Sequence, residues 1–164
     1  MRLPLMQRAN LSRVRAVGRW QQRVPCSPAV APAQWAYRLW KVTAMGKLLV
    51  HITSGPEAPT RAALGLLVAR AGIEEGHDVS IFLAGDAVQL IRDAVLDSLT
   101  GLGTGSLRES FDAIAAGGGR FYVSGMSSKA RGVTEDDLKG KPAELAMPNR
   151  LVQLAFETDR SFTY

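Results

Sequence analysis

The sequence predicts an α/β protein, a three-layer sandwich in which helices cover both faces of a mostly parallel sheet. Residues 47–53 and 78–84 are near-continuous apolar runs of strand length, which is typical of parallel strands covered on both faces. A helical period separates them and ends at the turn of residues 74–77, so the three segments form a strand-helix-strand unit. The buried stripe of this helix is expected at Leu64, Leu67, Val68 and Ala71.

The next segment repeats the alternation of helix and strand. Asp86 with Gln89 predicts a cap that opens a helix ending before Gly101. Ser106 begins a capping box for a shorter helix that runs to Ala116. Three glycines then lead into an apolar strand at residues 121–124.

The last third of the chain contains one further strand-helix-strand unit. Residues 134–137 predict a helical turn, and a short strand follows at 143–146. Pro148 marks a helix start, and a final strand is expected at 161–164. The buried stripe of the last helix is expected at Leu151, Leu154 and Ala155.

Charge divides the chain into two parts, residues 1–44 and 45–164. The first part holds eight of the 20 basic residues and no acidic residue, whereas the second holds all 15 acidic residues. Residues 1–44 are broken by prolines and lack an apolar period, so we expect a disordered or basic N-terminal extension. Two interpretations remain open: an organelle-targeting segment, or a misplaced start with translation beginning at Met45.

Residues 45–164 amount to one ordinary domain, and several functions are excluded for it. Its acidic residues outnumber its basic ones, which argues against nucleic acid as a partner. The absence of an apolar run of about 18 residues argues against a membrane span. His51 and His77 are far apart, and the single cysteine, Cys26, lies upstream, so we expect no metal site and no cofactor.

The strand at 121–124 ends at Ser124 and is expected to open into a small, polar, doubly basic loop at 125–132. In an open α/β sheet, ligands bind outside the carboxyl ends of the strands. We therefore predict a site for a small anion here, with the segment after the first strand as its second wall. A solvated or oligomer-facing charge pair is an equal alternative. The candidate ligand-binding residues are Ser54, Gly55, Ser124, Gly125, Ser127, Ser128, Lys129 and Arg131.

Three segments together resemble the DsrE/DsrF-like, or YchN-like, family of sulfur-relay proteins. They are residues 48–57, 81–88 and 123–132, in the same order and spacing. The resemblance covers residues 45–164. It implies a flavodoxin-like sheet of about five strands, cytoplasmic residence and self-assembly into trimers or hexamers. Many members carry a persulfide-bearing cysteine at the end of the third strand, where this chain has Ser124.

A serine hydroxyl is a poor nucleophile at neutral pH and forms no stable persulfide. The leading hypothesis is therefore a small oligomeric family member, non-catalytic or differently catalytic, that binds an anion or a protein partner. The alternatives are sulfur transfer through a partner's cysteine, and a hydrolase or transferase in which Ser124 is catalytic. The last needs a base, and the chain offers only His51, expected to be a hydrogen-bonded core residue, and His77.

Overall fold

The computed structural model describes residues 45–164, so the predicted extension at residues 1–44 lies outside the described part. Five strands form one sheet in the order β6-β5-β2-β1-β7, and each neighbouring pair is parallel. The predicted α/β class, with a parallel five-stranded sheet between helices, is confirmed. The strands are β1 (Lys47–Ile52), β2 (Asp78–Leu83), β5 (Arg120–Ser124), β6 (Ala143–Ala146) and β7 (Arg160–Thr163).

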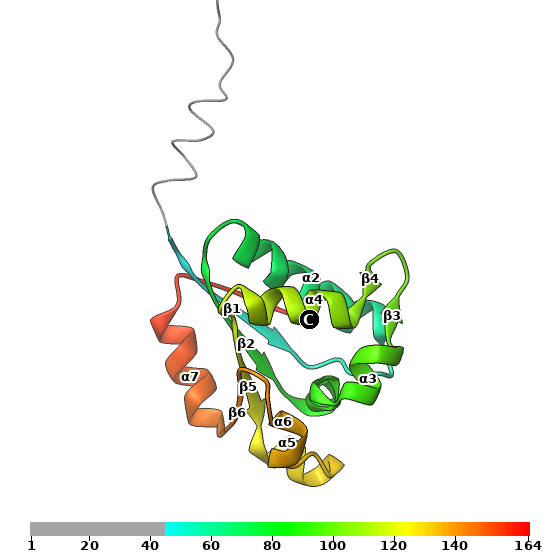
Figure 1. The fold of residues 1–164 in the computed structure, drawn as a ribbon. Helices are drawn as coiled ribbons and strands as arrows, with labels where there is room; N and C mark the ends of the chain where they lie inside the picture. The colour runs from blue at the N-terminus through cyan, green and yellow to red at the C-terminus, as the bar shows by residue number, and fades with distance from the viewer. Residues whose placement is uncertain (1–44) are drawn as a thin grey trace, which may run out of the picture. The chain divides into compact units, whose positions relative to one another are not determined.

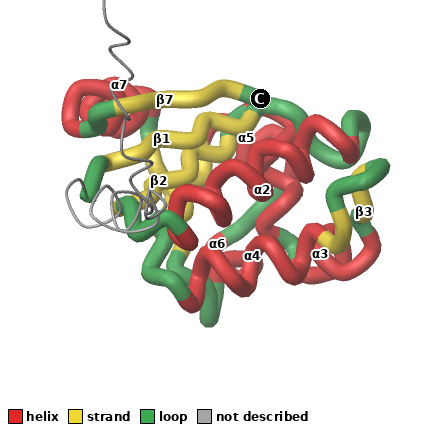
Figure 2. The backbone as a smooth tube through the Cα atoms, turned by 90° about the horizontal axis from the view of Figure 1, so that it is seen from above, coloured by secondary structure: helices red, strands yellow, loops and turns green. Residues whose placement is uncertain are grey.

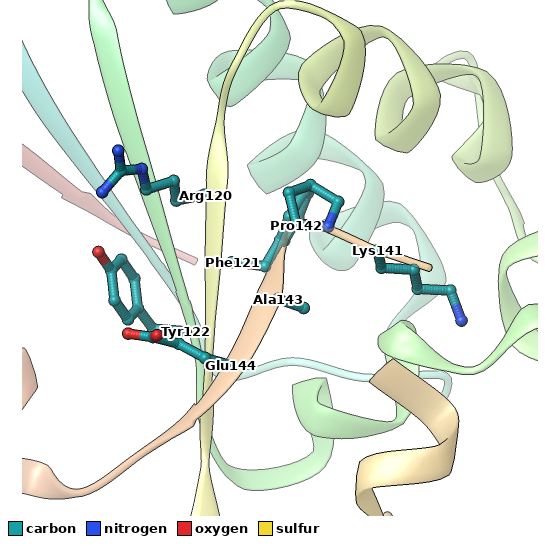
Figure 3. Close-up of a pocket in the computed structure, with 7 residues that line it drawn as sticks. All are labelled: Arg120, Phe121, Tyr122, Lys141, Pro142, Ala143 and Glu144. Carbon is teal, nitrogen blue, oxygen red and sulfur yellow. The ribbon is translucent and has the colours of Figure 1, made fainter. Parts of the chain in front are cut away.

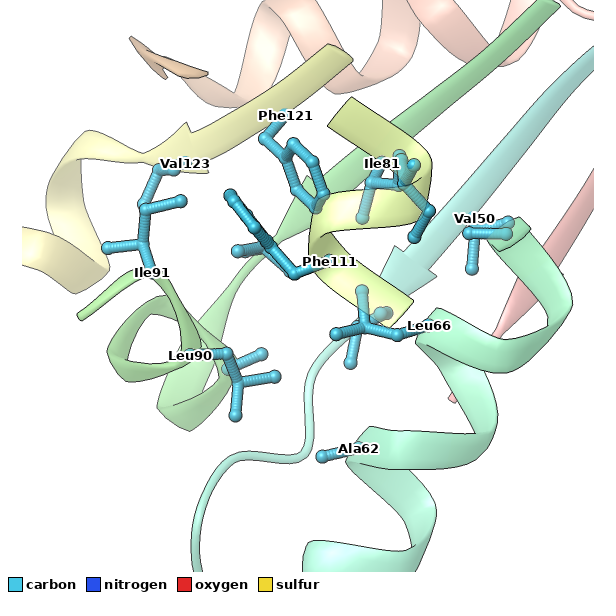
Figure 4. Packing of buried hydrophobic residues seen from close by; sticks show 14 of the residues in the cluster. Val50, Ala62, Leu66, Ile81, Leu90, Ile91, Phe111, Phe121 and Val123 are labelled. Carbon is cyan, nitrogen blue, oxygen red and sulfur yellow. The ribbon is translucent and has the colours of Figure 1, made fainter. Parts of the chain in front are cut away.

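Several helices cover one face of the sheet, and the larger core lies beneath them (Figures 1 and 4). Helix α2 (Pro59–Glu74) and helix α4 (Leu107–Ala116) pack on this face. The 3-10 helix η1 (Gly85–Ile91) and helix α3 (Asp93–Ser98) lie on the same face and also contribute to the core. Phe111 of α4 stacks on Phe121 of β5 with ring centroids 4.5 Å apart. Alternate strand residues such as Val50, Ile81 and Val123 complete this core.

The predicted buried stripe of α2 is wrong except for Val68, which is partly buried against the core. Leu64 and Leu67 are 39% and 38% exposed, while the buried positions are mostly small: Ala62, Ala63, Gly65, Leu66, Ala69 and Gly72. A Cβ atom at Gly65 would lie 2.7 Å from Cδ1 of Ile52. The helix therefore lies close to the sheet because its inner face is made of small residues.

The single helix predicted from Asp86 to before Gly101 is also wrong, because the chain forms η1 and α3 instead. Arg92 separates them in an extended conformation, with φ −75° and ψ 134°. Its guanidinium donates hydrogen bonds to the carbonyl oxygens of Arg131 and Gly132 at 3.1 and 2.5 Å. These contacts to residues 131 and 132, which follow strand β5, accompany the break between η1 and α3.

Helix α7 (Pro148–Glu157) lies on the opposite face of the sheet (Figure 2). Its Leu154 joins a smaller core with Leu49, Phe82 and Tyr122. Leu151 packs against the same core, but Ala155 is exposed, so that part of the predicted stripe is wrong. The outer side of α7 also carries exposed apolar residues. Val152 and Phe156 are 55% and 88% exposed.

The remaining elements largely follow the predicted caps. The hydroxyl of Ser106 accepts a hydrogen bond from the Glu109 amide at the start of α4. Thr134 and Asp137 form a capping box on helix α6 (Glu135–Leu138). Strands β3 (Thr100–Gly101) and β4 (Gly105–Ser106) pair as a small antiparallel hairpin. Among residues 45–164, no helix is long and apolar enough to cross a membrane.

Candidate functional site at the carboxyl edge of the sheet

Ser124 is the last residue of β5 and the N-cap of helix α5 (Gly125–Arg131). Its hydroxyl oxygen accepts a hydrogen bond from the Ser127 amide at 3.5 Å, and the residue is only 6% exposed. A capping hydroxyl satisfies one of the amide groups that a helix leaves unpaired in its first turn. Ser124 therefore ends the strand and starts the helix in one step.

The polar, doubly basic loop predicted after Ser124 is wrong, since these residues form α5. The helix begins at the Ser124 cap and ends at Gly132, which adopts a left-handed conformation with φ 64°. A glycine in this conformation is a common helix C-cap. The prediction took small polar residues as a sign of a loop and overlooked these two cap signals.

Two side-chain contacts join α5 to the turn that follows β2. The Gly85 amide donates a hydrogen bond to the Ser127 hydroxyl at 3.0 Å. The Arg131 guanidinium forms an ion pair with Asp86, with 2.7 Å between Nε and Oδ1. Arg131 is therefore already neutralised by a carboxylate, which weakens its value for binding a small anion.

The segment after β1 lies against the same turn. A Cβ atom at Gly55 would lie 2.3 Å from the carbonyl oxygen of Asp86, so the two backbones are in close contact. The Ala87 amide also donates to the carbonyl oxygen of Thr53 at 3.3 Å. Ser54 is 7% exposed at this junction. The ends of β1, β2 and β5 thus converge. The candidate residues after β1 contact Asp86, and those after β5 contact Gly85 and Asp86.

Two candidate residues do not share this arrangement. Lys129 is exposed in the last turn of α5 and has no ion pair within residues 45–164. Ser128 is only 2% exposed, and its hydroxyl oxygen has no hydrogen-bond partner in the described structure. Of the two predicted cations, Lys129 is therefore the unpaired one.

Exposed methionines next to Ser124 were missed by the sequence analysis. Met126 and Met147 are 63% and 54% exposed. A Cβ atom at Gly125 would lie 3.6 Å from the sulfur of Met147. Exposed methionines are adaptable apolar contacts and occur on surfaces that bind proteins. A single methionine before or after a small residue gives no sequence pattern that could have indicated this.

His51 is not the hydrogen-bonded core residue that the sequence predicted. Its Nε2 atom is buried without a hydrogen-bond partner among the described residues, and its ring packs edge-on against Phe82. Burial lowers the pKa of His51 below its usual value. Residues 45–164 contain no group of three or more His, Cys, Asp or Glu side chains that could hold a metal ion.

The fold and the junction at Ser124 define a parallel α/β protein whose polar groups converge where neighbouring strands end. This chain belongs to the DsrE/DsrF-like family, whose profile matches residues 46–164. It is also similar in fold to the crystal structure of the ychN protein from E. coli. The TM-score is 0.59 at 18% identity, over 73% of this chain and 100% of that chain. No curated protein matches the chain.

Proposed function

We propose that this protein is a DsrE/DsrF-like family member that carries no sulfur itself and binds a protein partner at the Ser124 edge. The observation that carries the proposal is that the Ser124 hydroxyl caps α5 and is almost fully buried. In a sulfur relay, the sulfur-carrying cysteine then belongs to the partner. Cytoplasmic residence, which the family resemblance implies, is part of the same proposal.

The chemistry of Ser124 supports a binding role over a catalytic one. A serine nucleophile needs a base within hydrogen-bond reach. Within the described residues, the only hydrogen bond of the Ser124 hydroxyl is the one it accepts from the Ser127 amide. Among residues 45–164, no imidazole or carboxylate is hydrogen-bonded to Ser124 to remove its proton, so we do not favour a serine hydrolase or transferase.

The surroundings of Ser124 favour a protein over a small anion. Arg131 is paired with Asp86, which leaves Lys129 as the free cation of the predicted pair in the described structure. Met126 and Met147 provide exposed apolar surface beside Gly125. An apolar surface next to a single positive charge suits a protein partner better than a compact anion.

We also propose that the chain self-assembles through the outer side of α7. Val152 and Phe156 are one helical turn apart and strongly exposed. Light scattering of the full chain should show a trimer or larger, and Val152→Ser with Phe156→Ser should reduce the mass. Leu102→Ser is a matched control, because Leu102 is 89% exposed in the β3–β4 hairpin and away from α7. A monomer in the unmodified chain would contradict assembly.

The sulfur chemistry is tested in the full chain with Cys26→Ser, so that no thiol remains. After treatment with a persulfide donor, mass spectrometry should show no added sulfur. The same chain with Ser124→Cys should gain one sulfur atom if the family's strand-end position is retained, because the Ser127 amide then faces the thiolate. Sulfur on the cysteine-free chain, or transfer to an acceptor through Cys26 in the unmodified chain, would overturn the proposal.

A further inference from the structure

A polar hollow of about 200 Å³ lies where the strands of the sheet begin, which we call the amino edge. Ser124 lies at the opposite side of the sheet, the carboxyl edge, where the strands end. The first residues of three strands line it, together with one side of α7. Its lining residues are Lys47, Asp78, Ser80, Arg120, Tyr122, Arg150, Leu154, Glu157 and Thr158. None of the residues predicted for the Ser124 site is among them.

A second hollow of about 390 Å³ adjoins the first, because Arg120 and Tyr122 line both. Figure 3 shows the side chains of Arg120, Tyr122 and Glu144 extending to one side of β5 and β6, with Lys141 on the other. Phe121, Pro142 and Ala143 complete its lining. The second hollow therefore has apolar as well as charged walls.

The first hollow contains hydrogen-bond donors without acceptors. Tyr122 is 3% exposed, and its hydroxyl oxygen accepts from Arg150 at 3.2 Å, but its own proton has no acceptor in the described structure. The side chains of Arg120 and Lys47, both exposed, have no ion pair among residues 45–164. The cost of an unused buried donor therefore applies to the Tyr122 hydroxyl, whereas the two exposed cations are open to a ligand or to water.

Carboxylates also line the first hollow. Three cations, Lys47, Arg120 and Arg150, face two carboxylates, Asp78 and Glu157, in its own lining, and Glu144 of the adjoining hollow is close enough to act on Arg150. The pair between Arg150 and Glu157 is long, with 3.4 Å between Nη1 and Oε2. Asp78 has no ion pair within the described residues, and it lies beside Lys47 in the strand register.

We infer that the amino edge of the sheet is an anion-binding site for a small organic oxyanion. Arg120, Arg150 and the Tyr122 hydroxyl bind the anionic group in the first hollow, and the body of the ligand occupies the second. Guanidinium groups bind carboxylate and phosphate through paired hydrogen bonds, and the Tyr122 phenol adds one more donor. This site is independent of the proposed role of the Ser124 edge.

The test is an NMR titration of the full, isotope-labelled chain at constant ionic strength with three probes: inorganic phosphate, phenyl phosphate and acetate. At least one probe should give saturable amide shifts centred on Ser80, Arg120 and Tyr122. Phosphate and acetate distinguish the two oxyanion classes. Phenyl phosphate should bind more tightly than phosphate because its ring enters the second hollow, and equal affinity contradicts the two-part site.

Variants assign the binding to named groups. Arg120→Gln should raise the dissociation constant roughly tenfold or more, since a charged hydrogen bond is lost. Tyr122→Phe keeps the ring and should raise it about fivefold. Lys129→Gln, at the opposite edge, should leave it unchanged. Absence of saturable shifts with all three probes, or equal affinity in Arg120→Gln and the unmodified chain, overturns the inference.

Discussion

The two edges of the sheet differ in how far their polar groups are already satisfied. At the carboxyl edge, Ser124 and Ser127 accept backbone hydrogen bonds and Arg131 is paired with Asp86. At the amino edge, Arg120 has no ion pair and the Tyr122 hydroxyl has no acceptor for its proton within the described residues. The edge where family resemblance predicts chemistry is thus mostly internally bonded, with Ser128 and Lys129 as exceptions in the described structure, and the opposite edge retains free donors on Arg120 and Tyr122.

The two edges differ in bonding because different residues lie where their strands meet the neighbouring turns. The carboxyl edge brings short turns together, so that Gly55 touches the backbone of Asp86. At the amino edge, the strands begin with the charged residues Lys47, Asp78 and Arg120, and all three are exposed. Close packing gives the carboxyl edge a fixed shape suited to docking, whereas the loosely filled amino edge leaves room for a ligand.

The largest expected effect is that of Gly55→Ala. The added Cβ atom would lie 2.3 Å from a backbone oxygen that cannot rotate away, so the turn after β2 must move. Overpacking of this kind costs about 1–3 kcal/mol in the free energy of unfolding. Gly46→Ala is the matched control at the amino edge, because its Cβ atom would lie 3.5 Å or more from its neighbours. Urea denaturation should show a loss for Gly55→Ala alone; equal stability of both variants would contradict tight packing at the carboxyl edge.

A smaller effect is expected for the two serines on the α7 side of the sheet. Ser124→Ala removes an N-cap and should lower the free energy of unfolding by about 1 kcal/mol. Ser80→Ala should be close to neutral, because the Ser80 hydroxyl forms no hydrogen bond in the described part of the chain. Denaturation midpoints at matched slopes measure both changes. A larger loss for Ser80→Ala would reverse the comparison of the edges.

The sequence predicted the architecture better than the packing. Strands β1 and β2 were predicted because an apolar run covered on both faces needs no alternation, and the caps at Ser106 and Thr134 are local signals. The inner face of α2 could not be found in this way. A rule that assigns the largest residues to the core chose Leu64 and Leu67, whereas close approach to the sheet selects Gly65 and its small neighbours.

The location of the candidate residues at strand ends was predictable from the sequence, but the bonding around them was not. The strand-end rule located Ser54 and Ser124, since it depends only on strand order. The pairing of Arg131 with Asp86 joins residues 45 positions apart and depends on where η1 packs against α5. The amino-edge hollow was missed because Lys47, Arg120 and Arg150 are scattered along the chain and form no motif.

A further comparison concerns one arginine at each edge. Arg131→Gln should destabilise the fold by up to about 1 kcal/mol, because its ion pair with Asp86 is short but partly exposed. Arg120→Gln should leave stability unchanged, since no ion pair of Arg120 is present among residues 45–164. Thermal denaturation at low and high salt provides the measurement. The loss of stability in Arg131→Gln should shrink at high salt. An equal loss of stability in Arg120→Gln would show that Arg120 forms a stabilising contact, which contradicts the comparison.

The smallest expected effect belongs to His51, which lies on β1 between the two edges. Burial lowers its pKa in the folded state, so the unfolded chain binds a proton at a higher pH than the folded chain. The neutral form is favoured in the fold, and this contribution to stability is complete above the unfolded pKa of about 6.5. It is lost as the pH falls below that value towards the lowered pKa of the folded state.

The unmodified chain should therefore lose stability on acidification from neutral pH through this range. His51→Leu should reduce that loss, because leucine can pack against Phe82 and has no proton to bind. His77→Gln retains His51 and should retain the loss. Calorimetry at several pH values measures all three chains. An unchanged pH dependence in His51→Leu would contradict this prediction. It would mean that the Nε2 atom of His51 has a hydrogen-bond partner in solution, and that the sheet is more polar around His51 than the structure shows.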